Sequence, residues 1–408
     1  MGHDHESPLL LLLTMPTAVL DIDLEKIPPE VVGLHDYKKA LVLIRFRSRP
    51  VGKAVVEVCG GRICGHHLRD QLLEAAGDLP WEFWLRDFLD WDETKNVRLP
   101  SATVAICTRE RTTDLAKCLS SLQKLQTQPL EILVIDNAPK TQKTRDLVTQ
   151  FFPTIRYICE PQTGLDWARN RALCEAQGEV VAFIDDDAIV DFAWLAGLLQ
   201  NFADPLVACV TGLTMPFELE TTSQEWFEIH CPFGKGFRRK IFKGDSHDPF
   251  RTGEIGAGVN MAVRREKILE LGGFDPALDA GTPTESGGDH EMFSRVLTHG
   301  YSIIYEPVAL CWHRHRRSPE ELRRAVYGYG AGVYALLSRA ILIEREWAAL
   351  KVAVGWFRHD QLPKLIYAVT RRPGREPLDL LFAELRGCVA GPFAYLRSRK
   401  LVSNGRAG

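Results

Sequence analysis

A run of apolar residues that ends in three consecutive aspartates constrains this chain more than any other feature. Residues 180–184 (VVAFI) are followed by Asp185, Asp186 and Asp187. An uninterrupted apolar run of this length predicts a strand buried on both faces of a sheet. The aspartates then lie at the carboxyl end of the strand, where open α/β sheets bind ligands. Because three crowded carboxylates repel one another, we expect a divalent cation there, and hard oxygen ligands favour Mg²⁺ or Mn²⁺.

The surrounding segment alternates between strand and helix patterns. Strands are predicted at residues 103–107, 130–135 and 155–158, and helices at residues 112–125, 141–152 and 164–176. Alternation at this spacing predicts an α/β fold, with a mostly parallel sheet sandwiched by helices. The strand at 130–135 ends at Asp136, so we expect Asp136 and the Asp triplet at one edge of the same sheet.

Residues 1–98 predict a small N-terminal α+β module. Residues 40–46 and 54–58 are strand-like, and residues 67–76 are helical. An aromatic cluster follows, formed by Trp81, Phe83, Trp84, Phe88 and Trp91. A zinc site is the alternative for Cys59, Cys64, His66 and His67. No second ligand pair has matching spacing, so a hairpin and turn is favoured.

The C-terminal part predicts a basic, helical region. From Arg314 to the end there are 18 Lys and Arg against 8 Asp and Glu, although the whole chain has a net charge of −3. Such a region can face phosphate, an acidic membrane surface or the acidic part of its own chain, and all three stay open. Residues 327–332 (YGYGAG) allow close helix packing, and packing against the sheet domain is favoured there over amphipathic membrane contact. No window of about 18 uncharged apolar residues predicts a membrane span.

The bulk properties are those of an ordinary globular protein with two or three domains. Apolar residues make up 45% and charged residues 25% of the 408 residues. The small net charge gives no reason to expect nucleic acid as a partner. Ten cysteines are unremarkable for this length, and no stretch resembles a secretory signal. We therefore expect a reducing, cytoplasmic location.

Six short segments, taken in order, resemble the family 2 glycosyltransferases of the GT-A fold. They are residues 104–111 (VAICTRER), 134–137 (VIDN), 164–170 (GLDWARN), 185–187 (DDD), 273–275 (GFD) with 288–291 (GDHE), and 312–316 (WHRHR). Each segment alone is a weak signal, whereas all six in order are specific. The resemblance covers about residues 102–317. The predicted domains are an N-terminal accessory module (1–98), a GT-A catalytic domain (99–317) and a helical C-terminal region (318–408).

The resemblance implies transfer of a hexosyl or deoxyhexosyl group from a nucleotide-diphospho-sugar to an acceptor hydroxyl, with inversion. It implies that Asp187 and His313 hold Mn²⁺ or Mg²⁺ and that Asp289 is the catalytic base. Contacts with the nucleotide sugar are implied for Thr108, Glu110, Arg111, Asp136, Arg169, Asp185 and Asp186. A glycan, a lipid-linked or a small-molecule acceptor all fit. Peripheral contact with the inner face of a membrane, through the basic C-terminal region, also stays open.

The chain departs from the family pattern at one position. Many members have Glu directly before the catalytic Asp, where this chain has Gly288. Glu291 is therefore an alternative base to Asp289. Apart from the resemblance, a structural role stays open for four residues, namely Asp136, Arg169, Asp289 (as a helix cap) and His313.

Other functions are less well supported by the motifs. A haloacid-dehalogenase-type phosphatase would use Asp185 and Asp187, but that fold needs the signature on its first strand and a catalytic Lys. A nucleotidyltransferase would need a Gly-rich basic loop after its first strand, and residues 107–111 contain no Gly. A non-catalytic nucleotide-sugar-binding scaffold is the remaining alternative. The substitution Asp187→Asn would distinguish a scaffold from an enzyme. An enzyme would lose metal-dependent turnover in this variant, whereas a scaffold has no turnover to lose.

Overall fold

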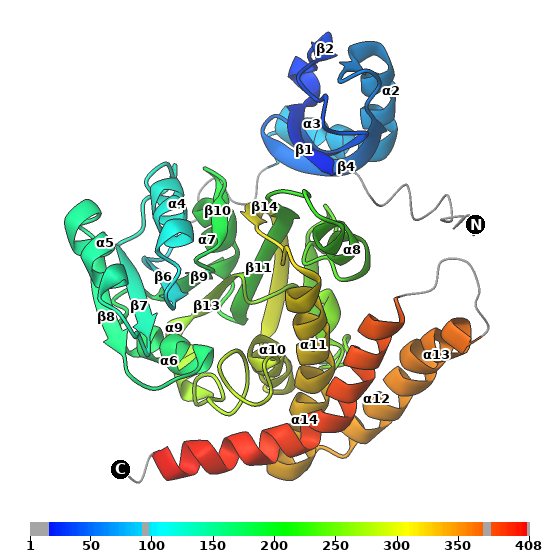
Figure 1. Cartoon of the computed structure of the whole chain (residues 1–408). Coiled ribbons are helices and arrows are strands. Elements are labelled where there is room, and N and C mark those ends of the chain that lie inside the picture. The colour runs from blue at the N-terminus through cyan, green and yellow to red at the C-terminus, as the bar shows by residue number, and fades with distance from the viewer. Residues whose placement is uncertain (1–15, 92–97, 370–376, 406–408) are drawn as a thin grey trace.

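A computed structural model describes residues 16–91, 98–369 and 377–405 of the chain. A small sheet with two helices forms one end of the molecule, a large sheet with helices lies in the middle, and long helices line the other end (Figure 1). The large sheet contains β6 (Ala102–Thr108), β7 (Glu131–Asn137), β8 (Arg156–Glu160), β9 (Val180–Ile184), β10 (Ala188–Val190), β11 (Val207–Pro216), β12 (Lys240–Lys243), β13 (Asn260–Arg264) and β14 (Ser302–His313).

The strand order of this sheet is β10-β14-β11-β13-β9-β6-β7-β8, and β12 pairs with β14. The strands β9, β6, β7 and β8 are parallel to one another, as the alternating pattern predicts. Beyond β9 the sheet is mixed, because β13 runs antiparallel to both β9 and β11. The strand β13 returns through the irregular stretch before it and not through a crossover helix, so strand–helix alternation carries no signal for it.

Helices cover both faces of the large sheet, which confirms the predicted α/β fold. One face packs against α4 (Thr112–Leu122), α5 (Lys143–Phe151) and α7 (Trp194–Leu199). The other packs against α6 (Leu165–Glu175), α9 (Arg265–Glu270) and α10 (Gly288–Thr298). The residues of β9 are buried on both sides, so a polar side chain in this chain segment can reach solvent only where the strand ends.

The N-terminal elements form a three-stranded sheet in the order β1-β3-β4. Its elements are β1 (Thr17–Asp23), β3 (Lys39–Phe46), β4 (Arg49–Glu57), α2 (Gly65–Ala76) and α3 (Leu79–Phe88), with β2 (Glu30–Val31) and β5 (Ile63–Cys64) as a separate pair. The predicted aromatic cluster lies on and after α3, and Trp81, Phe88 and Trp91 are exposed. Of the cluster, Phe83 packs against the core of this sheet, whereas these three side chains do not lie in it.

This module packs against the large sheet near the end of β14. The guanidinium of Arg45 donates to Asp191 at 2.7 Å, and both side chains are buried. It also lies over the ring of Trp312, 5.6 Å from the ring centre. The backbone N–H of Thr17 donates to the carbonyl of Leu219. Separating the module would leave Asp191 without this partner, whereas Arg45 would keep its ion pair with Asp21, so the buried pair favours the docked arrangement.

The described C-terminal residues form the α-helices α11 (Pro319–Arg339), α12 (Ala348–Trp356), α13 (Leu362–Val369) and α14 (Leu378–Gly405). The glycines of residues 327–332 let α11 and α14 approach closely: a Cβ on Gly330 would lie 2.4 Å from the carbonyl oxygen of Glu384. Close packing is thus present on two sides: Gly332 approaches Ser286 of the sheet domain, as predicted, and Gly330 approaches α14. Within the described residues, Pro319–Glu344 has the length and composition to cross a membrane, and half of its most apolar window is buried.

Candidate active site

The Asp triplet lies at the carboxyl end of β9, where the chain turns into β10. The N–H of Asp185 points to the carbonyl of Val259, and Ala188 pairs with His313 across the ladder between β10 and β14. This register brings His313 beside Asp187, with 3.0 Å between His313 Nε2 and Asp187 Oδ1. Two residues that are 126 positions apart in the sequence therefore share one site because two strands pair.

Asp185, Asp187 and His313 together have the geometry of a metal site. One ligand atom from each lies within 4.8 Å of the others, and among the described residues this is the group of His, Cys, Asp and Glu side chains with that property. Two carboxylates and an imidazole are ligands that suit Mn²⁺ or Mg²⁺. The residues that the sequence predicts as metal ligands, Asp187 and His313, thus lie together, and Asp185 joins them. No such group forms at Cys59 and Cys64, so the zinc alternative gains no support.

Asp186 points away from this group and toward β6. Its Oδ2 accepts a hydrogen bond from the hydroxyl of Thr108 at 2.7 Å, and Arg111 Nη1 lies 3.2 Å from its Oδ1. Arg111 also reaches Asp187 at 3.0 Å, and its side chain is 44% exposed. Arg111 therefore neutralises the triplet from the solvent side, where an anionic ligand can also reach it.

The three carboxylates have different acidities because their neighbours differ. Burial and the charge of Asp187 raise the pKa of Asp186 to about 7. Burial and Asp187 also raise the pKa of Asp185, although His313 works against this. For Asp187 the effect of burial is outweighed by His313 and Arg111, so its pKa is lowered. The cluster thus holds more negative charge than its surroundings compensate, which favours a bound cation.

The turn after β6 is held by Glu110, which adopts a left-handed conformation with φ of 58°. Its carboxylate accepts hydrogen bonds from the backbone N–H groups of Lys140 and Thr141, and from the Thr141 hydroxyl. These hydrogen bonds, the Thr141 hydroxyl foremost, lower the pKa of Glu110. Glu110 therefore ties the loop after β6 to the loop after β7, which is the edge predicted to hold the nucleotide.

Asp136, at the end of β7, is fully buried. Its Oδ2 accepts a hydrogen bond from the hydroxyl of Tyr157 at 3.0 Å, while Oδ1 has no partner among the described residues. Burial raises the pKa of Asp136. A buried carboxylate oxygen without a partner can accept a hydrogen bond from a ligand, so the predicted contact with the base of the nucleotide stays a prediction with a geometric basis.

Asp289 lies on the first turn of α10, on the far side of a short segment from Asp185. The N–H of Gly258 donates to Asp289 Oδ2 at 2.6 Å, and the next residue, Val259, accepts from the N–H of Asp185. Burial works against ionisation of Asp289, but His290, Arg169 and the Gly258 N–H outweigh it, so its pKa is lowered. Asp289 is thus a carboxylate held in its ionised form close to the Asp triplet.

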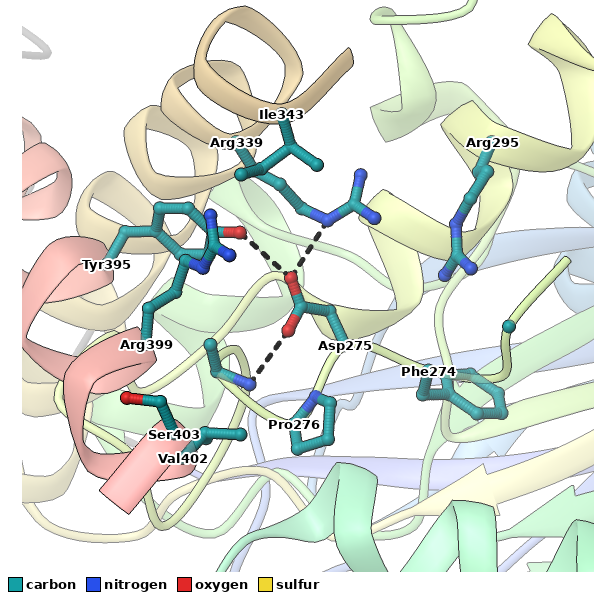
Figure 2. Close-up of a pocket in the computed structure, with 12 residues that line it drawn as sticks. Phe274, Asp275, Pro276, Arg295, Arg339, Ile343, Tyr395, Arg399, Val402 and Ser403 are labelled. Atoms are coloured by element: carbon teal, nitrogen blue, oxygen red, sulfur yellow. Dashed lines mark hydrogen bonds and ion pairs between the residues drawn. The ribbon is translucent and has the colours of Figure 1, made fainter. Parts of the chain in front are cut away.

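Glu291 points elsewhere. Its carboxylate forms a two-point ion pair with Arg295, and Arg339 of α11 lies 2.8 Å from it. Arg339 also donates to Asp275, which accepts the hydroxyl of Tyr395 from α14 (Figure 2). Asp275, Arg295, Arg339 and Tyr395 are among the residues that line a pocket of about 450 Å³ between the loop after α9 and the C-terminal helices. Glu291 and Asp275 therefore connect α10 to the C-terminal helices, and Asp289 is the better candidate for the base.

Arg169 is buried between two carboxylates. Its Nη1 donates to Asp166 at 2.9 Å and to Asp279 at 2.6 Å, and its side chain is 5% exposed. It also acts electrostatically on Asp289 and Asp185. The predicted contact of Arg169 with the diphosphate stays a prediction. In this structure its guanidinium connects Asp166 of α6 to Asp279 in the loop before α10.

Two further groups at the site have no role in the prediction from sequence. Arg316 lies 3.8 Å from Asp187 and is 40% exposed. His315 is buried, its Nε2 lies 3.2 Å from Glu228, and Glu228 accepts from Lys53 of the N-terminal module. The alternation of His and Arg in residues 312–316 is the sequence pattern that could have indicated Arg316. Lys53 comes from a separate module, so no local pattern could reveal it.

The comparisons with known proteins find glycosyltransferases. Residues 103–272 match the family model described as Glycosyl transferase family 2. The chain is 27% identical over 238 residues to the pre-mycofactocin glycosyltransferase of Mycobacterium tuberculosis, covering 57% of this chain and 47% of that protein. It is 25% identical over 297 residues to the glycosyltransferase AglE of Haloferax volcanii, covering 70% of this chain and 90% of that protein. The chain thus spans about half the length of the first of these relatives.

Among solved structures, the mannosyltransferase PcManGT from Pyrobaculum calidifontis in complex with GDP-Man and Mn²⁺ is 19% identical, with a TM-score of 0.45 over 80% of this chain and 82% of that chain. The match to the glycosyl transferase family 2 model over residues 103–272 agrees with the family that the six motifs resemble. The phosphatase alternative is not favoured, because β6, β7 and β8 precede the strand that carries the Asp triplet.

Proposed function

We propose that this chain transfers a glycosyl group from a nucleotide-diphospho-sugar to an acceptor hydroxyl, with inversion and with the assistance of Mn²⁺ or Mg²⁺. The proposal rests on two acidic centres that contact neighbouring residues of one segment: Gly258 contacts Asp289, and Val259 contacts Asp185. One centre is the group of Asp185, Asp187 and His313, and the other is Asp289. Transfer from such a donor needs a cation for the leaving group and a base for the acceptor.

The residues of the first centre would hold the donor. Asp185, Asp187 and His313 would bind the cation, which when bound supplies a Lewis acid for the diphosphate. Arg111 and Arg316 lie beside Asp187 with exposed side chains, so both can turn toward phosphate oxygens. Thr108 and Asp186 would order the first strand turn against the nucleotide.

Asp289 would accept the proton of the acceptor hydroxyl. Its lowered pKa keeps it ionised at neutral pH, and the N–H of Gly258 fixes one of its oxygens. Inversion follows when the acceptor is activated on the face of the sugar opposite to the leaving group. Residues 279–288 lie beside this carboxylate, and the left-handed conformations at Asp279, Gly281, Glu285 and Gly287 make the segment a tight loop suited to excluding water.

The finer substrate assignments belong to the same proposal. The transferred group would be a hexose or deoxyhexose, and the acceptor a glycan, a lipid-linked sugar or a small molecule. The expected location is the cytoplasm, at the inner face of a membrane. The fold offers a surface for this contact on α14, whose outward positions are exposed and apolar: Leu378, Phe382, Val389, Phe393 and Leu396.

These five positions recur at intervals of three, four or seven residues, so they form one stripe along the helix. Arg386 and Lys400 are exposed on the same stripe, and the opposite side of α14 packs on α11. An apolar stripe flanked by cations complements an anionic lipid surface. Sedimentation with vesicles of phosphatidylglycerol and phosphatidylcholine tests this contact. The variant Phe382→Ser with Phe393→Ser should lose binding. Trp81→Ser, which removes an aromatic side chain on α3 that is as exposed as Phe393, should retain it.

Release of nucleoside diphosphate from a panel of UDP, dTDP and GDP sugars, with and without Mn²⁺, tests the proposed reaction. We expect release with at least one donor, dependent on the metal and lost in Asp187→Asn. Hydrolysis of p-nitrophenyl phosphate, without release from any nucleotide sugar, would instead support a phosphatase. Binding of a nucleotide sugar without any release, also after addition of glycan and lipid-linked acceptors, would support a scaffold.

A further inference from the structure

The carboxylate of Asp166, which lies close to the proposed base Asp289, has no role in the proposed reaction. Asp166 lies on the first turn of α6 and is fully buried. Its Oδ1 accepts a hydrogen bond from Arg169, but its Oδ2 has no hydrogen-bond partner among the described residues. Leaving a carboxylate oxygen buried without a partner is costly, so its placement needs a reason.

The unpaired oxygen points at the residue before the base. A Cβ on Gly288 would lie 2.0 Å from Asp166 Oδ2 and 2.7 Å from its Cγ. The backbone of Gly288 does not need a left-handed conformation, unlike that of Gly287 at φ of 107°. Glycine is therefore required at position 288 for space, and the space is taken by the carboxylate of Asp166.

The same carboxylate is connected to Asp289 through Arg169. One guanidinium nitrogen of Arg169 bridges Asp166 and Asp279, and the other approaches Gly258. A Cβ on Gly258 would lie 2.7 Å from Arg169 Nη2 and 3.0 Å from the side chain of Asp289. Arg169 and Asp289 thus both pack against Gly258, and Asp166 accepts a hydrogen bond from Arg169.

We propose that Asp166 is a positioning residue for the base: its carboxylate takes the place of a side chain at position 288 and holds Arg169 and the first turn of α10 around Asp289. This inference rests on the proposed function. It also explains the departure in sequence, because the glutamate that the resemblance implies at position 288 would occupy the volume of Asp166. A carboxylate still occupies this volume, but Asp166 of α6 supplies it and residue 288 of α10 does not.

Exchanging the two positions tests the inference. Gly288→Glu alone places two carboxylates in one volume, so we expect a lower melting temperature and loss of turnover. Adding Asp166→Gly opens that volume, and the double variant should recover both. Asp166→Gly alone should lower kcat by about 10- to 100-fold, the usual effect of removing a group that orients a reacting residue. KM for the donor should change little.

The matched control is the double variant Asp166→Gly with Gly288→Gln, which has the same shape and no charge. We expect it to recover the melting temperature but not kcat, whereas the Glu variant recovers both. Equal kcat in the Gln and Glu variants would show that Asp166 only fills space, and would overturn the inference. Failure of either double variant to recover the melting temperature would overturn it as well.

The proposed reaction and this inference fail in different ways. If the parent chain releases nucleoside diphosphate from no donor, the reaction is wrong, and the melting temperatures still test whether the two positions share one volume. If the parent chain is active and Asp166→Gly keeps its kcat, the reaction stands and the positioning role is wrong.

Discussion

The site contains two acidic centres that differ in how their charge is balanced. At the end of β9, the Asp triplet is faced by Arg111 and Arg316, with side chains 44% and 40% exposed. At the start of α10, Asp289 and its neighbours are faced by Arg169, with a side chain 5% exposed. Exposed guanidinium groups can exchange a carboxylate for a phosphate, and a buried one cannot without leaving a charge unpaired. The first centre is therefore suited to binding and releasing a ligand, and the second to keeping one carboxylate in a fixed state.

The largest effect should come from removing a ligand of the first centre. In Asp187→Asn we expect turnover to fall by about 10³-fold, since a bound cation contributes several kcal/mol to the stabilisation of a departing diphosphate. Nucleoside diphosphate release at saturating Mn²⁺ measures the loss. Unchanged, metal-independent release in this variant would break the comparison, because the triplet would then be a structural cluster.

Removing the base should reduce catalysis but not binding. In Asp289→Asn we expect kcat to fall by about 10²- to 10³-fold, the usual contribution of a general base, with KM for the donor changed by less than about threefold. Steady-state kinetics at fixed Mn²⁺ measure both constants. A large rise in KM with unchanged kcat would show that Asp289 contributes to donor binding. The two centres would then have the same role, which contradicts the comparison.

Glu291→Gln separates this effect from simple destabilisation. Its carboxylate is buried between Arg295 and Arg339, so the variant should lose about 3 kcal/mol of stability. Turnover per folded molecule should stay close to that of the parent chain. A loss of kcat as large as that of Asp289→Asn would make Glu291 the base.

Arg111 is expected to contribute mainly to binding of the donor. Loss of one charge-assisted hydrogen bond to phosphate should weaken affinity by about tenfold in Arg111→Met. Arg109→Met, two residues away and exposed, is the matched control and should have a smaller effect. Titration calorimetry with a nucleoside diphosphate and Mn²⁺ measures both. Equal effects of the two variants would argue for a general charge effect without a specific contact.

The smallest effect concerns the pH dependence of stability. Burial raises the pKa of Asp186 to about 7, whereas an unfolded Asp has a pKa of about 3.9. Between these values the folded chain holds a proton that the unfolded chain has released, so stability falls as pH rises. With the metal chelated, the melting temperature of the parent chain should fall from pH 5 to pH 7.5, and less steeply in Asp186→Asn. Identical slopes would show that Arg111 and Thr108 compensate Asp186 fully.

The sequence predicts the first centre better than the second. The apolar run before Asp185 places the triplet at a strand end, and the parallel strands around β6 follow from local alternation. The contact between Asp187 and His313 follows from the pairing of β10 and β14, which only the family resemblance made predictable. Local sequence patterns thus predict helices and strands. They predict a site only where a single strand supplies most of its residues.

The second centre depends on contacts that local patterns do not contain. Asp166 and Gly288 share one volume although they are far apart in the chain, and a glycine at a helix start gives no sign of what fills its space. The antiparallel insertion of β13 and the docking of Lys53 beside Glu228 are long-range in the same way. The exposed cluster at Trp81 shows the converse, since aromatic spacing on a helix does not tell which face is buried.

We infer that Asp185, Asp187 and His313 bind a cation, and that this cation binds the diphosphate of the nucleotide. Thermal melting of the parent chain and of Asp187→Asn, with UDP, dTDP and GDP each added with and without Mn²⁺, tests it most directly, because a ligand that binds only the folded chain raises the melting temperature. We predict stabilisation by at least one nucleotide that requires Mn²⁺ in the parent chain and is absent from the variant. No stabilisation by any nucleotide, with or without the metal, would contradict the account.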